Sequence, residues 1–116
     1  MTEDRYIESL RRKLIRNGAA EDFMTNRSRE RYQYVYPRFV MMYCLKKLRG
    51  KQVVQTGAIF GKGHPEVLYA NRVVCNMISD RYGDDIFKSR YGNIINIMTR
   101  YEAMRKRRMQ KQRIQP

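Results

Sequence analysis

The residues best suited to chemistry lie in one short stretch, Gly61-Lys62-Gly63-His64-Pro65-Glu66. A cation just before the start of a helix, together with unpaired backbone N–H groups, is suited to binding phosphate. The stretch does not resemble a hydrolase site, because no nucleophile or paired carboxylates accompany His64. It also differs from a nucleotide-binding phosphate loop, since three residues, not four, separate Gly57 from Gly61 and no Ser or Thr follows Lys62. The pattern therefore predicts binding and no enzyme activity.

The segments on either side of this stretch have the pattern of a helix-turn-helix. Apolar residues over 51–60 predict a short helix, which the glycine-rich turn ends. Pro65 suits the first turn of a second helix, predicted over 65–79, with Gly63 or His64 as its cap. In a helix-turn-helix, the amino end of the second helix enters the major groove of DNA. The candidate DNA contacts on this motif are Lys62, His64, Pro65, Glu66 and Tyr69.

The rest of the chain predicts further helices. Ile7, Leu10 and Leu14 share one side of a helix predicted over 3–16, and the polar residues 17–29 predict a linker. The alternating Tyr32, Tyr34 and Tyr36 predict an extended arm. Pro37 then begins a helix predicted over 38–48, and the last helix is expected from residue 91 or 93 to beyond 104, after a loop at 80–85.

The predicted fold class is therefore all-α, a helix-turn-helix bundle of about five helices with a basic carboxyl-terminal tail. Three segments are expected: an amino-terminal helix and linker (1–26), a helix-turn-helix core (27–79), and a carboxyl-terminal helix and tail (80–116).

Positive charge dominates the chain from residue 27 onward. The 25 Lys and Arg against 11 Asp and Glu give a net charge of +14 and a pI near 10.2, although residues 1–26 are electrically balanced. This imbalance indicates a polyanion as partner, bound more weakly as salt rises. The basic candidates outside the turn are Arg27, Arg29, Arg31, Arg38, Lys46, Lys47 and Lys51.

Other classes of protein and site are not expected. No apolar run approaches the roughly 20 residues of a membrane span, and the acidic amino terminus is unlike a secretory signal. Cys44 and Cys75 lie in apolar surroundings, which predicts buried free thiols in a reducing cytoplasm. One His and two Cys do not supply the ligand pairs of a metal site. We expect no cofactor and no metal, and a location in a bacterial cytoplasm or nucleoid.

The stretch TGAIFGKGHPEVLYANRVV, Thr56 to Val74, resembles the signature of the carboxyl-terminal DNA-binding domain of the bacterial replication initiator DnaA. The matching residues are Gly57, Phe60, Gly61, Lys62, His64, Val67, Leu68 and Ala70. Upstream, YVYPRFVMMYCLKKL looks like the family's helix that follows an Arg-Pro-Arg-type turn. The resemblance covers about residues 27–79, and no ATPase module accompanies it.

This resemblance implies a helix-turn-helix domain that binds duplex DNA. By matching position, Lys62 stands for the Arg of the family's turn and His64 for its His, both in the major groove. Arg29 or Arg31 stands for an Arg in the minor groove. The chain also departs from the family. Thr56 replaces an Ile, Gly63 stands where the family has an Asp, and Pro65 and Glu66 replace two hydroxyl residues. Glu66 would accept a hydrogen bond from a cytosine amino group or, alternatively, stabilise the start of its helix.

One interpretation is a stand-alone duplex-binding module, encoded by a phage or a mobile element, that has a replication-accessory or transcription-regulatory role. Two other interpretations remain open. In the first, Tyr32, Tyr34 and Tyr36 stack on bases of RNA or single-stranded DNA; otherwise they pack the arm onto the core. In the second, the chain is a structural or interaction protein that pairs with a partner through the apolar stripe between Ile94 and Met104; a homodimer through this stripe is also compatible with duplex binding.

Overall fold

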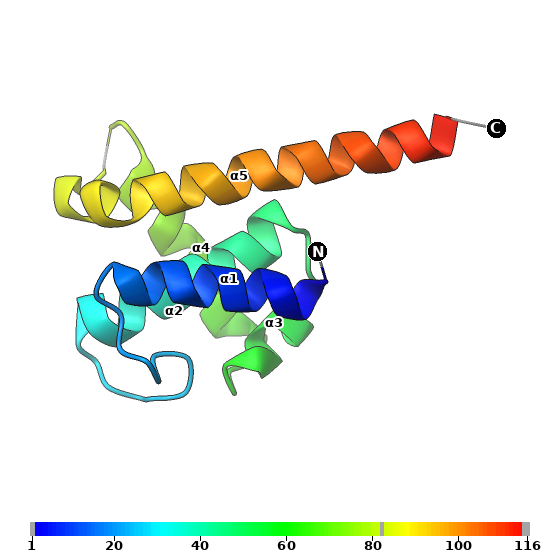
Figure 1. The fold of residues 1–116 in the computed structure, drawn as a ribbon. Coiled ribbons are helices and arrows are strands. Elements are labelled where there is room, and N and C mark those ends of the chain that lie inside the picture. Colours follow the sequence, from blue (N-terminus) through cyan, green and yellow to red (C-terminus); the bar gives the residue numbers. More distant parts are fainter. Residues whose placement is uncertain (1, 82, 115–116) are drawn as a thin grey trace.

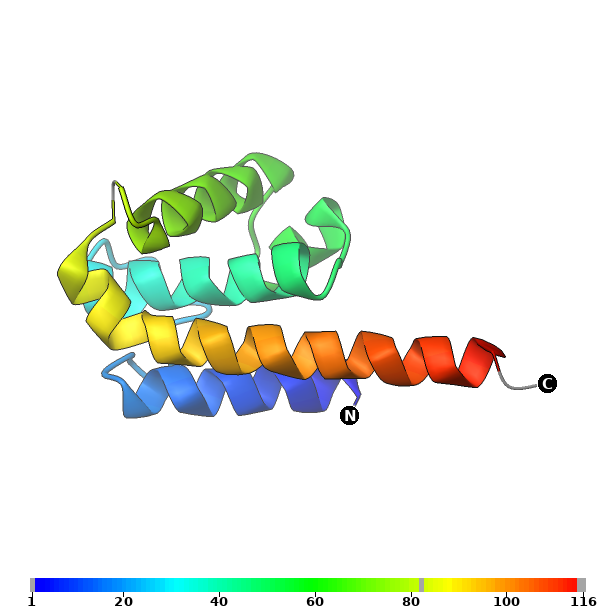
Figure 2. The same ribbon diagram turned by 90° about the horizontal axis from the view of Figure 1, so that it is seen from above.

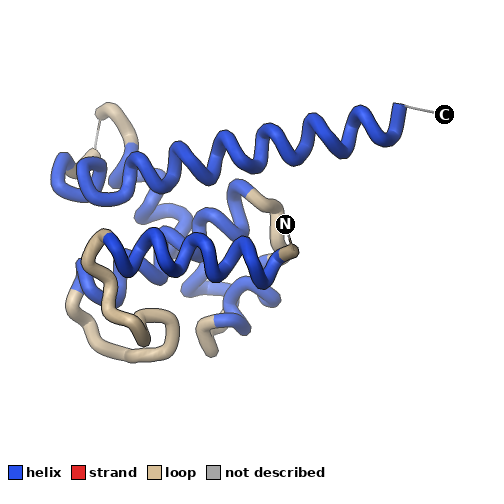
Figure 3. Tube along the Cα trace, viewed as in Figure 1, coloured by secondary structure: helices blue, strands red, loops and turns tan. Residues whose placement is uncertain are grey.

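The computed structural model describes residues 2–81 and 83–114, with the side chains of residues 2–81 and 83–111. Every regular element of these residues is a helix, which confirms the all-α prediction (Figure 3). In chain order they are α1 (Glu3–Arg16), η1 (Arg31–Val35), α2 (Tyr36–Tyr43), η2 (Cys44–Leu48), α3 (Val53–Ile59), α4 (His64–Ile78) and α5 (Asp85–Ile114). Tyr82, in the predicted loop, and the side chain of Arg113, in the predicted tail, lie outside the described residues.

Helix α2 and its continuation η2 lie at the centre of the molecule. Helix α4 packs on one side of α2, and α1 and α5 lie on the other (Figures 1 and 2). The core draws side chains from all three predicted segments, including Leu10 from α1, Met41 from α2, Val74 from α4 and Met98 from α5. The three segments therefore share one apolar core.

Helix α1 begins and ends where the sequence predicts. The Thr2 hydroxyl accepts a hydrogen bond from the backbone N–H of Arg5 at 3.3 Å, as an N-terminal cap does. Tyr6, Leu10 and Leu14 are fully buried, whereas Ile7 is only half-buried. The buried stripe is therefore centred one residue earlier than the aliphatic spacing predicted, because the ring of Tyr6 fills the core.

Residues 31–35 form a wide helical turn, so the prediction of an extended arm was wrong. The backbone N–H of Val35 donates to the carbonyl of Glu30, five residues back, at 3.1 Å. The Glu30 carboxylate accepts hydrogen bonds from the N–H groups of Tyr32 and Gln33, the latter at 2.6 Å. This cap satisfies donors at the start of the helix and favours helical over extended backbone.

Pro37 lies in the first turn of α2, as predicted, but η1 precedes α2 without a break, so the helical segment is continuous from 31 to 48. Proline has no N–H, so the carbonyl of Gln33, four residues earlier, loses its usual intrahelical donor. The N–H of Ala20 donates to that carbonyl at 2.9 Å instead. The loop between α1 and η1 is thus held against the helix at the point where proline leaves an acceptor open.

Helix α5 begins earlier than its predicted range, whereas its end at Ile114 agrees with the prediction of an end beyond residue 104. It begins at Asp85, where the Asp84 carboxylate accepts a hydrogen bond from the N–H of Phe87 at 2.9 Å. Phe87 and Tyr91 are fully buried in the core. The helix therefore begins directly after the loop, because both rings pack in the core from its first turns. The basic residues predicted as a tail continue the helix, whose carboxyl end extends past the other helices (Figure 2).

Candidate nucleic-acid interface

Helices α3 and α4 and the tight turn between them form a helix-turn-helix. Gly61 has φ +66°, a conformation that favours glycine. The N–H of Lys62 donates to the carbonyl of Gly57 at 2.9 Å, and a Cβ on Gly57 would overlap the carbonyl oxygen of Lys62. Two of the glycines that the sequence singled out therefore let the turn fold back onto α3.

The amino end of α4 presents its first residues to solvent. Gly63 occupies the cap position and has no side chain to bond the helix's first N–H groups. His64 and Pro65 are exposed, and Lys62 is partly exposed. On the opposite side of α4, which packs against α2 and α3, Val67, Ala70 and Val74 are fully buried. The burial of one side fixes which side of α4 faces outward.

The outward side of α4 continues beyond its first turn. Tyr69 is 54% exposed and packs its ring edge-on against Phe39, with centroids 5.8 Å apart. Leu68 and Arg72 are also exposed. Neither was among the candidate contacts, although the 100° spacing of a helix places Arg72 on the same side as Pro65 and Tyr69. That spacing was the signal that could have added Arg72.

Arg38 is buried, which corrects its prediction as a DNA contact. It is only 5% exposed, and its Nη1 donates to the carbonyl oxygens of Phe23 at 3.1 Å and Asn26 at 2.5 Å. Burial lowers the pKa of the Arg38 guanidinium, and the nearby carboxylate of Glu66 raises it in part. A buried guanidinium needs such partners to offset its lost hydration. Arg38 thus anchors the loop that precedes the basic residues 27–31.

The basic arm, residues 27–31, follows directly from this anchor. Arg27, Arg29 and Arg31 are all exposed. The backbone of the arm is ordered by local bonds: the N–H of Ser28 donates to the Asn26 side-chain oxygen at 2.9 Å, and the N–H of Glu30 to the Ser28 hydroxyl at 3.3 Å. The arm's three guanidinium groups are therefore held at the surface by a structured turn.

Helix α2 connects the arm to the helix-turn-helix. Arg38 binds the carbonyl of Asn26, next to Arg27, and the following residue, Phe39, packs its ring against Tyr69 of α4. The loop before the arm and helix α4 are therefore both held by the same part of α2. The charge of Glu66 raises the pKa of Arg38 in part, which adds to the two roles the sequence left open for Glu66.

The remaining basic candidates divide into two kinds. Lys46 and Lys47 lie at the end of η2, with Lys47 exposed and Lys46 partly exposed. Lys51 forms an ion pair with Glu3 of α1, with Nζ and Oε1 2.5 Å apart. Its charge is used within the fold, so we remove Lys51 from the candidate interface.

The tyrosines before α2 pack on the core and on one another. Tyr32 stacks on Tyr91 with centroids 6.4 Å apart, and its carbonyl accepts a hydrogen bond from the Tyr91 hydroxyl at 3.3 Å. The guanidinium of Arg90 lies 4.7 Å from the centroid of Tyr32. Tyr36 meets Phe87 edge-on at 5.3 Å. Of the two roles considered for these rings, base stacking and packing on the core, Tyr32 and Tyr36 have the packing role in the structure.

The apolar stripe of α5 faces the chain's own core, which corrects its prediction as a dimer interface. Ile94 and Met98 are buried, and Tyr101 is partly buried against Tyr6, with ring centroids 6.0 Å apart. Ile97 and Met104 alone of the predicted stripe are exposed. Most of the stripe is therefore covered within one chain, and only Ile97 and Met104 face outward.

The two thiols differ. Cys44 is buried in η2, as predicted, and burial together with the charge of Glu102 raises its pKa. Cys75 is exposed on α4, so its prediction as a buried thiol was wrong. Neighbouring valines suggested burial, but the helical spacing places Cys75 outside the buried stripe of Val67, Ala70 and Val74.

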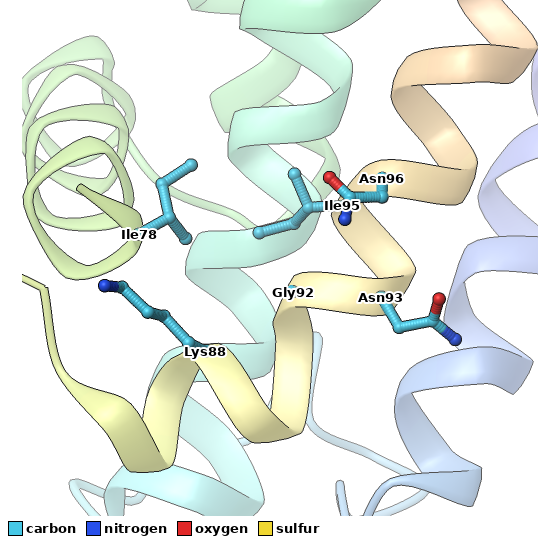
Figure 4. A pocket seen from close by; sticks show the side chains of 6 residues that line it. All are labelled: Ile78, Lys88, Gly92, Asn93, Ile95 and Asn96. Carbon is cyan, nitrogen blue, oxygen red and sulfur yellow. The ribbon is translucent and has the colours of Figure 1, made fainter. Parts of the chain in front are cut away.

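No alternative site with its own chemistry stands out in the part of the chain that the structure describes. No group of three metal-binding side chains lies together there, and none of its helices has the length and apolarity to span a membrane. A shallow pocket lies between the end of α4 and α5, flanked by Ile78 and Lys88 and otherwise lined by Gly92, Asn93, Ile95 and Asn96 (Figure 4). Lys88 is its one charged residue, so the pocket lacks a combination of groups for catalysis.

No protein-family model, curated protein sequence or solved structure matches the chain. The functional argument therefore depends on the geometry and charge of the helix-turn-helix and the basic arm.

Proposed function

We propose that this chain binds duplex DNA through the amino end of α4 and the basic arm at 27–31. The observation that carries the proposal is the exposed amino end of α4, where Gly63 provides no side-chain cap for the first N–H groups, together with the loop before the arm that Arg38 of α2 holds. A helix end in the major groove and a basic segment beside it can hold one duplex through adjacent grooves. The net charge of +14 favours such a partner.

Within this proposal the contacts have different tasks. Arg27, Arg29, Arg31 and Lys62 bind phosphates or a narrow minor groove, which attracts arginine. His64, with the exposed ring of Tyr69 one turn further on, reads base edges in the major groove. Glu66 keeps two tasks, stabilising the first turn of α4 and accepting from a cytosine amino group. Lys46 and Lys47 add phosphate contacts at the edge of the surface.

The wider role follows from the resemblance to the DnaA DNA-binding domain over residues 27–79. We propose a DNA-binding module of the cytoplasm or nucleoid that assists replication or regulates transcription without an ATPase of its own. The second candidate, RNA or single-stranded DNA binding, needs free aromatic faces. Tyr32 and Tyr36 contact other rings instead, which favours the duplex.

Fluorescence anisotropy with variants separates these functions. We expect His64→Ala to cost roughly 1–3 kcal/mol on a selected duplex and to relax one base position. Tyr34→Ala should change duplex affinity little, and Arg16→Ala, on the exposed side of α1, serves as a control for a substitution outside the proposed interface. If Tyr34→Ala weakens nucleic-acid binding more than His64→Ala, the single-strand interpretation replaces the proposal.

A further inference from the structure

The last buried residue of α5 fixes the direction in which its carboxyl end leaves the core. Glu102 is 2% exposed, and its carboxylate accepts hydrogen bonds from Nη1 of Arg49 and of Arg105, each at 3.2 Å. The Arg49 guanidinium also lies 4.6 Å from the ring centroid of Tyr6. Side chains from α1 and the end of η2 therefore hold α5 at Glu102.

Beyond Glu102, the helix makes little contact with the rest of the chain. We call residues 103–111 the basic projection. None of its side chains is buried, and only Arg105 is partly covered. In Figure 2 this part of α5 extends past the other helices, toward the same end of the molecule as the amino end of α4.

The charges of the basic projection surround the helix. Successive residues of an α-helix are turned by about 100°, which puts Lys106 and Arg108 on nearly opposite sides. Met104 and Met109 are about 140° apart by the same spacing and form no stripe. A helix that lies in a membrane surface needs a continuous apolar face, and so does one that pairs with a second helix. The basic projection has no such continuous apolar face.

These charges also have few partners of their own. Arg105 is paired with Glu102, but no acidic residue follows Glu102 in the sequence. Arg107 and Lys111 are one turn apart, and such a like-charge pair destabilises an isolated helix. A partner with negative charge on both sides of the helix would remove this repulsion. The major groove of DNA, about 12 Å wide and bordered by two phosphate strands, admits an α-helix.

We propose that the basic projection is a second DNA-binding element, which lies along a groove and contacts phosphates outside the segment read by α4. This inference rests on the proposed function and extends it. The binding site of the whole chain is then longer than the segment contacted by the helix-turn-helix. Because the contacts are to phosphates, they add affinity and salt dependence without changing the preferred sequence.

Two charge-matched variants of the full chain test this inference. The first, Lys106→Gln/Arg107→Gln/Arg108→Gln, neutralises the basic projection. The second, Arg5→Gln/Arg12→Gln/Arg16→Gln, removes the same charge from exposed positions of α1. Affinity for a 30-base-pair duplex containing the selected sequence is measured over a range of salt, together with the length of duplex protected from hydroxyl radicals.

We expect the first variant to flatten the slope of log K against log salt by about 2–3 units, since each lost phosphate contact contributes roughly 0.9. The region of duplex that the first variant protects should shorten at one end, while its selected sequence stays as in the parent chain. The α1 variant should protect the same length of duplex as the parent chain. An equal slope and equal protection for both variants would overturn the inference. So would binding of the parent chain to phosphatidylserine vesicles that the first variant loses while its DNA protection stays unchanged.

Lys62→Ala separates this inference from the proposed function. If Lys62→Ala weakens binding and the variant of the basic projection does not, the second element is wrong and the helix-turn-helix stands. If the variant of the basic projection weakens binding and Lys62→Ala and His64→Ala do not, the basic projection binds DNA and the proposed function is wrong.

Discussion

Arg38 donates a hydrogen bond from Nη1 to the carbonyl oxygen of Asn26 at 2.5 Å, and this bond ties the central helix to the loop from which the basic arm emerges. The next residue of the same helix, Phe39, packs its ring edge-on against Tyr69 of α4. An arginine that the charge pattern marked as a DNA contact is instead the residue that anchors the loop before the arm to the helix on which α4 packs.

Arg38→Met should therefore destabilise the fold and weaken DNA binding together. The change keeps the long aliphatic side chain but leaves the carbonyls of Phe23 and Asn26 without their charged donor, at a cost of about 2–3 kcal/mol. Urea unfolding measures the loss. If stability is unchanged while DNA affinity falls, Arg38 acts on DNA directly and its anchoring role is wrong.

Gly57→Ala should open the turn of the helix-turn-helix. The added methyl group would overlap the carbonyl oxygen of Lys62, which is backbone and can move only if the turn moves. We expect a loss of about 1–3 kcal/mol, typical of overpacking. Gly92→Ala is the matched control, because a Cβ there meets no atom within 4 Å and α5 should gain up to about 1 kcal/mol in helix propensity. Equal effects at the two glycines would contradict the close approach at Gly57.

Glu102→Gln should cost stability because it leaves Arg49 in the interior without its charged partner. The side chain of Arg49 is only 9% exposed, and removing one member of a buried ion pair typically costs about 3–5 kcal/mol. Glu8→Gln on α1 is the comparison, since its pairs with Arg11 and Arg12 are exposed and should be worth less than about 1 kcal/mol. Thermal or urea unfolding of both variants would show the difference, and similar losses would mean that Glu102 does not hold α5.

Alkaline pH should destabilise the chain. Burial raises the pKa values of Tyr6, Tyr91 and the Cys44 thiol. In the unfolded chain the thiol loses its proton near pH 8.5 and the phenols near about pH 10, while the folded chain keeps these protons. The unfolded state then binds fewer protons, so the free energy of unfolding falls as pH rises above about 9. The lowered pKa of Arg38 acts in the opposite sense, over the interval between that lowered value and the ordinary arginine pKa of about 12.5.

Urea unfolding between pH 7 and 11 measures this loss. Tyr91→Phe is the matched variant, because it removes one buried phenol and one hydrogen bond to the carbonyl of Tyr32. It should be less stable than the parent chain at pH 7 and lose less stability on going to pH 11. A stability that rises from pH 9 to pH 11 would contradict the burial of these groups.

Helices with an apolar stripe between clear end signals could be predicted from the sequence. Thr2 and Asn17 bound α1, and the glycine-rich turn with Pro65 bounds α4. The failures have specific causes. Tyrosine alternation predicted an extended arm, but the Glu30 carboxylate caps a helix there. The start of α5 was missed because the predicted stripe began at Ile94, although Phe87 and Tyr91 continue the same spacing of four and three residues toward the amino end.

For the candidate interface, the sequence supplied the turn and the basic arm but could not distinguish a surface cation from a buried one. Arg38 and Arg31 look alike in a charge count. Only the long-range contacts show that Arg38 binds carbonyls 12 and 15 residues away and that Lys51 pairs with Glu3. Such contacts depend on the packed fold, which local patterns do not contain.

The most direct test of the central claim is a competition assay, in which random-sequence duplex DNA competes with single-stranded DNA and RNA for the full chain as salt is raised. Sequence selection on the tightest-bound class follows. The proposal predicts that the duplex is preferred at every salt concentration and that selection enriches one motif, which His64→Ala relaxes. Equal binding of all three nucleic acids, lost together as salt rises, would contradict it and leave only a generic basic surface.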